Sequence, residues 1–197
     1  MAFNEGAVKP PFPATLRHVA AVLGQRSDTN GPNLEAALRQ NRHHRSGYFG
    51  ELVFAATFAI VLLASSTLKP SITVILLGCG LVAFTLAEYI THRFVLHAIA
   101  PVQHGIHHAR PRDAVDKIFW QIWVGFVALY FTTGGAVLAG ALFAYAWYLF
   151  IHYCAHHNPA ILPASLLKHH LDHHRFANRN YGVTTTFWDR VFGTMLR

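Results

Sequence analysis

Histidines with the spacing of metal ligands dominate two stretches of this sequence. Residues 92–108 and 152–174 together hold twelve of its fifteen histidines. Neutral imidazole is a favoured ligand of Zn, Fe, Cu and Ni, and residues three or four apart share one face of a helix. If the stretches are helical, each cluster points its nitrogens at one locus. The candidate metal ligands are His92, His97, His104, His107, His108, His152, His156, His170, His173 and His174.

The spacing within the clusters is helical in three cases out of four. The triplets that begin at His104 and at His170 stand at i, i+3, i+4, and His152 is followed by a histidine at i+4. His92 and His97 are the exception, because five residues turn a regular helix by about 140°. If both of these are ligands, the helix must end, bulge or unwind between them.

The number of candidate ligands predicts two metal ions. One ion takes about four protein ligands in a tetrahedral site and no more than about six in most geometries, so ten histidines are too many for one. Two ions in one site could activate dioxygen rather than only support a fold. A solvated, adventitiously metal-binding histidine tract is the alternative, but four separate clusters with apolar flanks argue against it.

The order of these clusters, together with the tail NYGVTTTFWDRVFGT at residues 180–194, resembles the fatty acid hydroxylase and sterol desaturase superfamily of integral membrane proteins. The resemblance covers about residues 50–197 and looks nearest to the fatty acid hydroxylase branch. It implies that the ten histidines are catalytic ligands of a dimetal centre, taken to be iron in the active enzyme, or zinc as isolated. Such a centre uses O2 and reducing equivalents to hydroxylate or desaturate a lipid.

The expected reaction is therefore hydroxylation of a long-chain lipid or fatty acyl C–H bond by a membrane oxidoreductase. Residues 1–50 carry no haem, flavin or iron–sulfur pattern, so we expect an external electron donor: a cytochrome, a ferredoxin or a reductase. Three alternatives stay open. They are a lipid or sterol desaturase, a carotenoid hydroxylase, and a non-enzymatic membrane protein in which zinc supports the fold.

The elements that must position these histidines are four apolar segments. Apolar residues make up 53% of the chain, and charged residues 13%, half the usual share of about 25%. The segments have lengths near the about 20 residues that cross a bilayer core, although the third is short. The prediction is an all-α integral membrane four-helix bundle of two transmembrane hairpins, with segments at residues 51–68, 72–91, 118–133 and 136–153.

The basic residues predict how the bundle lies in the membrane. Of sixteen Lys and Arg residues, only Lys69 falls in the turn opposite the termini, so both termini and the middle loop should be cytoplasmic. We expect a polar arm at residues 1–47 and a membrane domain at 48–197, whose histidine-rich helical cap comprises residues 92–117 and 154–197. This topology and contact with lipid head groups account for the net charge of +7, so no nucleic-acid partner is expected.

Several further residues are candidates for orienting the ligands, because a ligating histidine usually donates its other N–H to a carboxylate or carbonyl. Glu88 lies four residues before His92 and is expected to be the only acid inside an apolar segment, where an ionisable group is functional by default. The remaining candidates for contacts behind the metal ligands are His157, His169, Asp172 and Asp189.

Overall fold

The computed structural model describes residues 45–99, 104, 105, 107, 108, 111, 112 and 120–196. Within these residues the chain is helical and contains no strand. Four longer helices and four short elements follow one another along the chain: α3 (Arg45–Ala64), α4 (Pro70–Ile90), η1 (Thr91–Ile99), α6 (Trp120–Thr133), α7 (Gly135–His157), η2 (Pro159–Ile161), α8 (Ala164–Arg175) and α9 (Phe187–Val191).

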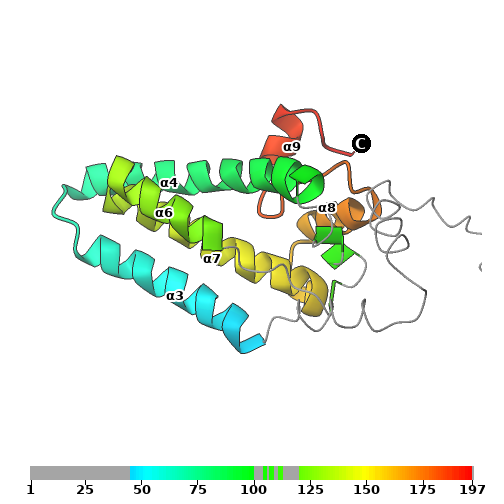
Figure 1. The fold of residues 1–197 in the computed structure, drawn as a ribbon, viewed down its shortest axis with the longest axis horizontal. Coiled ribbons are helices and arrows are strands. Elements are labelled where there is room, and N and C mark those ends of the chain that lie inside the picture. Colours follow the sequence, from blue (N-terminus) through cyan, green and yellow to red (C-terminus); the bar gives the residue numbers. More distant parts are fainter. Residues whose placement is uncertain (1–44, 100–103, 106, 109–110, 113–119, 197) are drawn as a thin grey trace, which may run out of the picture.

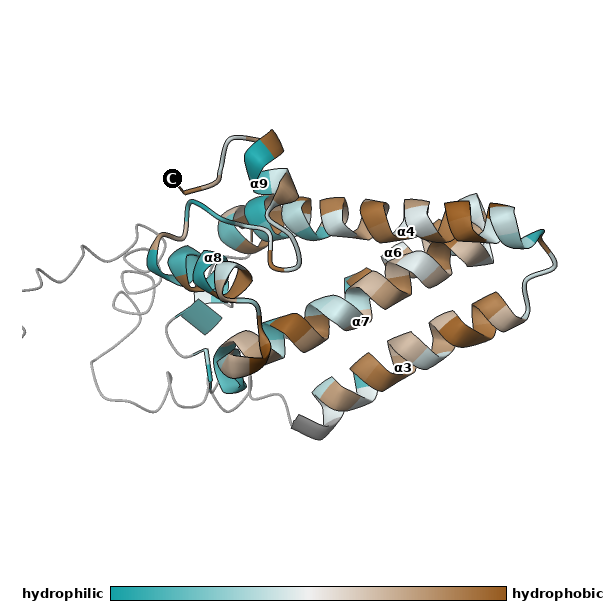
Figure 2. Cartoon of the chain, turned by 180° about the vertical axis from the view of Figure 1, so that it is seen from behind, coloured by the Kyte–Doolittle hydropathy of each residue, from teal (hydrophilic) through white to brown (hydrophobic). Residues whose placement is uncertain are grey.

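The long helices run lengthwise, and the short C-terminal helices gather at one end of them. The α3–α4 turn and the α6–α7 turn lie at the opposite end from α8, α9 and the C-terminus (Figure 1). Hydrophobic residues cover the long helices, whereas hydrophilic residues concentrate around α8 and α9 (Figure 2). The molecule is therefore divided along its long axis into an apolar part and a polar end.

Helix α7 is the centre of the apolar part, with α3, α4 and α6 packed against it. Within its most apolar stretch 72% of the residues are buried, against 17% for α3 and 11% for α4 with η1. The α4–α7 contact is so close that a Cβ on Gly80 would fall on the Val137 carbonyl oxygen, and one on Gly140 on the Leu77 carbonyl oxygen. Small residues allow such approach between apolar helices.

Three helices in the described part of the chain are long and apolar enough to cross a membrane: residues 47–64, 70–99 and 135–157. They correspond to the first, second and fourth predicted segments. The third corresponds to α6, which has 14 residues; its predicted start at residue 118 lies outside the described residues. The apolar surface of α3, α4 and α6 agrees with a protein that sits in a membrane.

The predicted segments leave gaps at residues 69–71 and 134–135, and the structure confirms a break between helices at both. Pro70 occupies the first turn of α4, where its missing N–H costs no hydrogen bond. Gly134 separates α6 from α7 with φ at 87°, a left-handed conformation that residues with a Cβ rarely adopt.

The expectation that Glu88 is the only acid inside an apolar segment is wrong. Helix α3 begins by Arg45 rather than at residue 51, so Glu51 lies inside the helix and is 9% exposed. Its Oε1 accepts hydrogen bonds from the Tyr145 hydroxyl at 2.5 Å and from Trp123 Nε1 at 3.0 Å. The sequence places these partners on later segments, where no local pattern links them to a residue at the edge of the first.

The expected irregularity between His92 and His97 takes the form of a π-helix. Element η1 continues α4 without a break and has nine residues. Its i→i+5 hydrogen bonding widens the turn, so residues five apart return to nearly the same face. The wider turn brings both histidine rings to one side, with centroids 5.1 Å apart.

Some predicted features fall outside the described residues. They comprise residues 1–44 of the expected N-terminal arm, residues 100–103, 106, 109–110, 113–117 and 197 of the expected cap, and residues 118–119 of the third predicted segment.

Candidate metal centre

The ten candidate ligands lie in two groups of five at the polar end of the long helices. In each group one nitrogen from every histidine lies within 4.8 Å of the others. The first group comprises His92, His97, His104, His108 and His173, and the second comprises His107, His152, His156, His170 and His174. Element η1 supplies two histidines to the first group, and α7 supplies two to the second. Helix α8 contributes to both groups, as does the triplet His104, His107 and His108.

Each histidine triplet is divided between the two groups, contrary to the expectation that a triplet points at one locus. His104 and His108 enter the first group and His107 the second, whereas His170 and His174 enter the second and His173 the first. The reason is helical geometry: at about 100° per residue, positions i and i+4 differ by about 40°, but i+3 and i+4 by about 100°. Each triplet therefore lies between the groups and serves both.

Rings from the two groups are in contact. His108 of the first group stacks on His174 of the second with centroids 4.3 Å apart, and His107 lies 5.7 Å from His104. The two loci are therefore neighbours within one site, as a two-metal centre requires.

Backbone carbonyls set the protonation of two ligands in the first group. His92 Nδ1 lies 2.5 Å from the Tyr181 carbonyl oxygen, and His173 Nδ1 lies 2.7 Å from that of Arg179. A carbonyl only accepts, so each Nδ1 carries the hydrogen and each neutral ring turns a bare Nε2 lone pair into the group.

In the first group, Nε2 atoms of different histidines lie close together, so their lone pairs could bind one cation. His92 Nε2 lies 2.9 Å from His104 Nε2, and His173 Nε2 lies 3.1 Å from His97 Nε2. The second group shows the same convergence, with His152 Nε2 2.9 Å from His107 Nε2 and His170 Nε2 2.9 Å from His156 Nε2. A metal ion at each locus would bind these lone pairs.

The surroundings also keep the rings neutral. Burial and the charges of neighbouring histidines hold the pKa of His104, His170 and His173 well below the usual 6.5. The same two causes lower the pKa of His174. Because a proton would occupy the ligating nitrogen, a low pKa keeps it available for a metal.

Glu88 contacts the C-terminal segment rather than a ligand ring. Its Oε1 accepts the Val183 amide at 2.6 Å and the Thr184 amide at 3.2 Å, and its Oε2 accepts the Thr184 hydroxyl. Two residues before Val183, the Tyr181 carbonyl accepts from His92 Nδ1. The predicted role of Glu88 in orienting a ligand stays a prediction.

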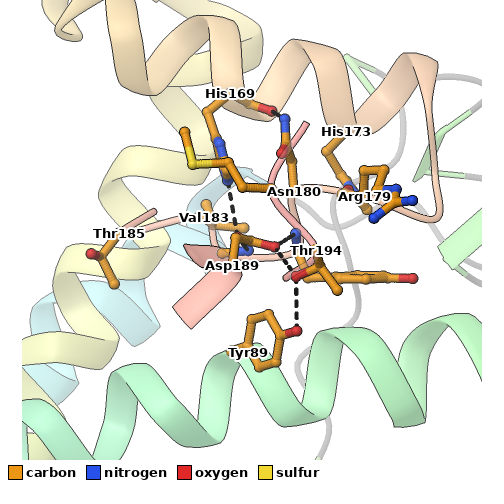
Figure 3. A network of polar contacts seen from close by, with 12 residues as sticks. Tyr89, His169, His173, Arg179, Asn180, Val183, Thr185, Asp189 and Thr194 are labelled. Atoms are coloured by element: carbon orange, nitrogen blue, oxygen red, sulfur yellow. Dashed lines mark hydrogen bonds and ion pairs between the residues drawn. The ribbon is translucent and has the colours of Figure 1, made fainter. Parts of the chain in front are cut away.

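Asp189 is fully buried and accepts four hydrogen bonds (Figure 3). The donors are the Tyr181 and Gly182 amides at 2.8 Å, the Thr194 hydroxyl at 2.7 Å and His169 Nε2 at 3.0 Å. Burial acts to raise its pKa, but the hydrogen bonds outweigh burial and hold the pKa below 3.8. Asp189 thus links Tyr181, whose carbonyl accepts from His92, to His169, which precedes His170 in the sequence. The predicted roles of Asp189 and His169 stay predictions.

The other two candidates for contacts behind the ligands are His157 and Asp172. The His157 ring stacks on Tyr153 with centroids 4.3 Å apart, at the end of α7. Asp172 pairs with Lys168 one turn earlier on α8. Their predicted roles stay predictions.

Tyr181 and Arg179 were not predicted as site residues, although both hold ligands. They do so through backbone carbonyls, which every residue has, so their side chains give no signal. The Tyr181 ring could have been suspected, because it lies within the distinctive tail. Its centroid is 5.4 Å from the His97 ring and 5.6 Å from the His173 ring.

Comparison with known proteins adds a family. The sequence model described as "Fatty acid hydroxylase" matches residues 77–194, a range that includes every candidate ligand. Dihydroceramide fatty acyl 2-hydroxylase FAH2 of Arabidopsis thaliana is 33% identical in an alignment 147 residues long, which covers 61% of this chain and 60% of the relative. Ceramide very long chain fatty acid hydroxylase scs7 of Schizosaccharomyces pombe is 36% identical in an alignment 140 residues long, which covers 58% of this chain and 40% of the relative.

A solved structure shares the fold. "Full length scs7p (only hydroxylase domain visible)" aligns with a TM-score of 0.65 at 28% identity, and the alignment covers 80% of this chain and 68% of that one. The matches to the two enzymes above span 60% and 40% of their lengths, so this chain corresponds to part of each.

Proposed function

Because the chain belongs to the fatty acid hydroxylase family, we propose that it hydroxylates a fatty acyl or other long-chain lipid C–H bond with O2 and an external electron donor. The observation that carries the proposal is the pair of five-histidine groups, each converging within 4.8 Å. We propose two metal ions there, iron in the active enzyme and zinc as an isolated form.

In this proposal the protein holds the two metal ions and orients the histidines that bind them. When bound, two redox-active ions supply the activation of O2 for insertion of oxygen into a C–H bond. The Tyr181 and Arg179 carbonyls turn the His92 and His173 lone pairs toward the first locus. His107 and His173 are at most 1% exposed, so the protein excludes bulk water from these two histidines, whereas His97, His108 and His174 are half-buried.

The position of the histidines along the helices favours oxidation near the polar end of the lipid. His92 and His152 lie in the C-terminal halves of the spans at residues 70–99 and 135–157, and these helices run toward the end of the molecule where α8 lies (Figure 1). In a membrane, head groups would meet acyl chains at that end. The curated relatives are named as 2-hydroxylases or ceramide hydroxylases. We therefore propose carbon 2 of an acyl chain, with an amide-linked acyl lipid as the substrate class.

The arrangement in the membrane is part of the proposal. Residues 48–197 would form the hydroxylase domain as a bundle of two hairpins, preceded by a polar arm at residues 1–47. The termini and the histidine-rich cap would face the cytoplasm, where an external cytochrome, ferredoxin or reductase delivers electrons. The clustering of hydrophilic residues around α8 and α9 (Figure 2) supports a polar cap at that end.

The test is a lipid comparison by mass spectrometry in cells grown with 18O2. Cells expressing the intact chain should contain a lipid heavier by one labelled oxygen, and cells expressing His173→Ala should lack it. Cys79→Ala, at an exposed position of α4 outside both groups, serves as the control and should behave as the intact chain. Fragmentation of the acyl chain locates the labelled carbon.

Two other outcomes identify the alternatives. Loss of two hydrogens without label would replace hydroxylation by desaturation. No difference between the intact chain and His173→Ala, with iron loaded and a reductant supplied, would favour zinc that supports the fold without redox chemistry.

A further inference from the structure

The segment from Arg179 to Thr194, which we term the C-terminal strap, lies against both α4 and α8. Its Arg179 carbonyl accepts from His173 Nδ1, and its Tyr181 carbonyl accepts from His92 Nδ1. Both histidines belong to the first group. The strap thus contacts that group through backbone atoms on two sides.

Two buried carboxylates fix the backbone of the strap. Asp189 accepts the amides of Tyr181 and Gly182 from within the strap. Glu88, on α4, accepts the amides of Val183 and Thr184. Four consecutive amides are therefore held by carboxylate oxygens, and this places the Tyr181 carbonyl at a set distance from η1.

Side-chain contacts complete the fixation. Asn180 has a positive φ of 56° and donates from Nδ2 to the His169 carbonyl at 3.2 Å. The Thr194 hydroxyl contacts Tyr89 on α4 at 2.9 Å (Figure 3), and Trp188 Nε1 donates to Thr85 at 3.0 Å. The strap is thus tied to α8 at one end and to α4 along its length.

We propose that the strap positions the first histidine group selectively, so that releasing it weakens metal binding there while the second group keeps its ion. This inference rests on the proposed two-metal function. Loss of an outer hydrogen-bond partner of a ligating histidine typically weakens metal binding by about 10–100-fold. His152 and His156 of the second group are instead carried by α7, the most buried helix.

Glu88 is the residue on which the proposal can be tested. Asp189 also contacts His169, beside the second-group ligand His170, whereas the side-chain contacts described for Glu88 are all with the strap. Glu88→Ala leaves the Val183 and Thr184 amides without their acceptor. Glu88→Gln keeps an oxygen for both amides, and its NH2 can donate to the Thr184 hydroxyl, so the strap should stay in place.

The experiment measures Zn2+ bound to the purified full-length chain in detergent, by elemental analysis and by competition with a chelator. The intact chain and Glu88→Gln should hold two equivalents. Glu88→Ala should hold one equivalent tightly, with the affinity of the other lowered about 10–100-fold. Glu51→Ala removes a comparably buried carboxylate from α3 and should keep both equivalents. This control distinguishes the effect of releasing the strap from the effect of removing any buried carboxylate.

Double variants assign the lost equivalent to a group. Combined with His173→Ala, a first-group change, Glu88→Ala should cause no further loss. Combined with His174→Ala, a second-group change, it should leave no tightly held ion. If Glu88→Ala does not yield folded protein, Thr184→Val takes its place, because it removes the hydroxyl contact to Glu88 and should weaken the same equivalent to a smaller degree.

Two equivalents held with unchanged affinity in Glu88→Ala, or both weakened equally, would overturn the inference. The proposed function would survive either result. An intact chain that binds no metal would overturn both. Glu88→Gln that loses one equivalent as Glu88→Ala does would show that the negative charge matters rather than the placement of the strap, which also contradicts the inference.

Discussion

A histidine binds a metal only through a ring nitrogen that carries no hydrogen. The hydrogen-bond partner of the other ring nitrogen decides which of the two nitrogens is free to bind. In the first group two of these partners are carbonyls of the strap, at Arg179 and Tyr181. The single residue with the most influence over those carbonyls is Asp189, because its carboxylate binds two adjacent amides of the strap and one α8 histidine.

Asp189→Asn should destabilise the protein. Four donors converge on the two oxygens of Asp189, and an asparagine must turn its NH2 toward at least one of them. We expect a loss of about 1.5–3 kcal/mol, measured as a lower Tm in detergent. Asp172→Asn is the matched control, because its Lys168 partner is 76% exposed and such pairs contribute at most about 1 kcal/mol. Equal Tm values for the two variants would contradict the prediction.

The metal-free protein should lose stability as the pH falls below about 6.5. Burial and neighbouring histidine charges lower the pKa of His104, His170, His173 and His174 in the folded state. Below 6.5 the unfolded chain binds protons that the folded chain does not, so the free energy of unfolding decreases with falling pH and is fully retained above that value. Asp189 acts in a different window, because its depressed pKa matters only below 3.8.

The measurement is the Tm of chelator-treated protein at pH 8, 7, 6 and 5. His174→Gln removes one of the titrating rings and should make the decline shallower. A Tm that stays constant across the series would show that these rings are not buried as neutral groups.

The ten candidate ligands could be singled out from their spacing, but their division into two groups could not. Residue type and order single out the ten histidines, because few other patterns place so many at helical intervals. Which of them face together depends on where each helix lies. The split of His107 from His108 becomes evident only in the structure, where His108 joins the first group and His107 the second. The contacts of the Arg179 and Tyr181 carbonyls could not be predicted, because a pattern of side chains carries no information about backbone carbonyls.

At the scale of elements, the α4–α7 contact should be the most sensitive to added volume. Helix α4 leads into η1, which carries His92 of the first group, and α7 carries His152 of the second. The α4–α7 contact therefore holds the two histidine groups in position relative to each other. Gly80→Ala would place a methyl group on the Val137 carbonyl oxygen and against the Ala141 amide. We expect the helices to separate, at a cost of about 1–3 kcal/mol, with a lower Tm and a lower metal content.

Gly78→Ala is the control for this prediction. It lies on the same helix two residues earlier, and a Cβ there meets nothing within 4 Å. It should therefore match the intact chain in Tm and in metal content. A Gly80→Ala protein as stable as Gly78→Ala would mean that α4 and α7 are not in backbone contact.

The elements were predictable where local chemistry determines them. Pro70 and Gly134 mark helix boundaries because of their own backbone preferences, and the five-residue spacing of His92 and His97 indicates an irregular turn. The sequence does not predict that α3 begins before Glu51, because a carboxylate is typical of the edge of an apolar segment rather than of its interior. Its partners Tyr145 and Trp123 lie on other helices, and only tertiary structure reveals them.

At the scale of the whole molecule, charge and histidine placement agree on one polar end. The α3–α4 turn, with Lys69, lies at the end opposite α8 and α9 (Figure 1). Arg175, Arg179 and Arg190 belong to the end that carries the histidine groups. If the positive-inside rule decides the orientation, the metal centre faces the cytoplasm and its supply of electrons.

A pair of single cysteines should report this orientation in intact cells. Cys79 and Cys154 are first replaced by alanine, and Lys69→Cys or Ser165→Cys is then introduced, at the α3–α4 turn or on α8. A membrane-impermeant thiol reagent added outside should label the Lys69→Cys protein, because that turn would lie across the membrane from the cytoplasm. The Ser165→Cys protein should react only after permeabilisation. The opposite labelling pattern would place the metal centre outside, beyond the reach of cytoplasmic electron donors, and the donor in the proposed reaction would then have to be sought in that compartment.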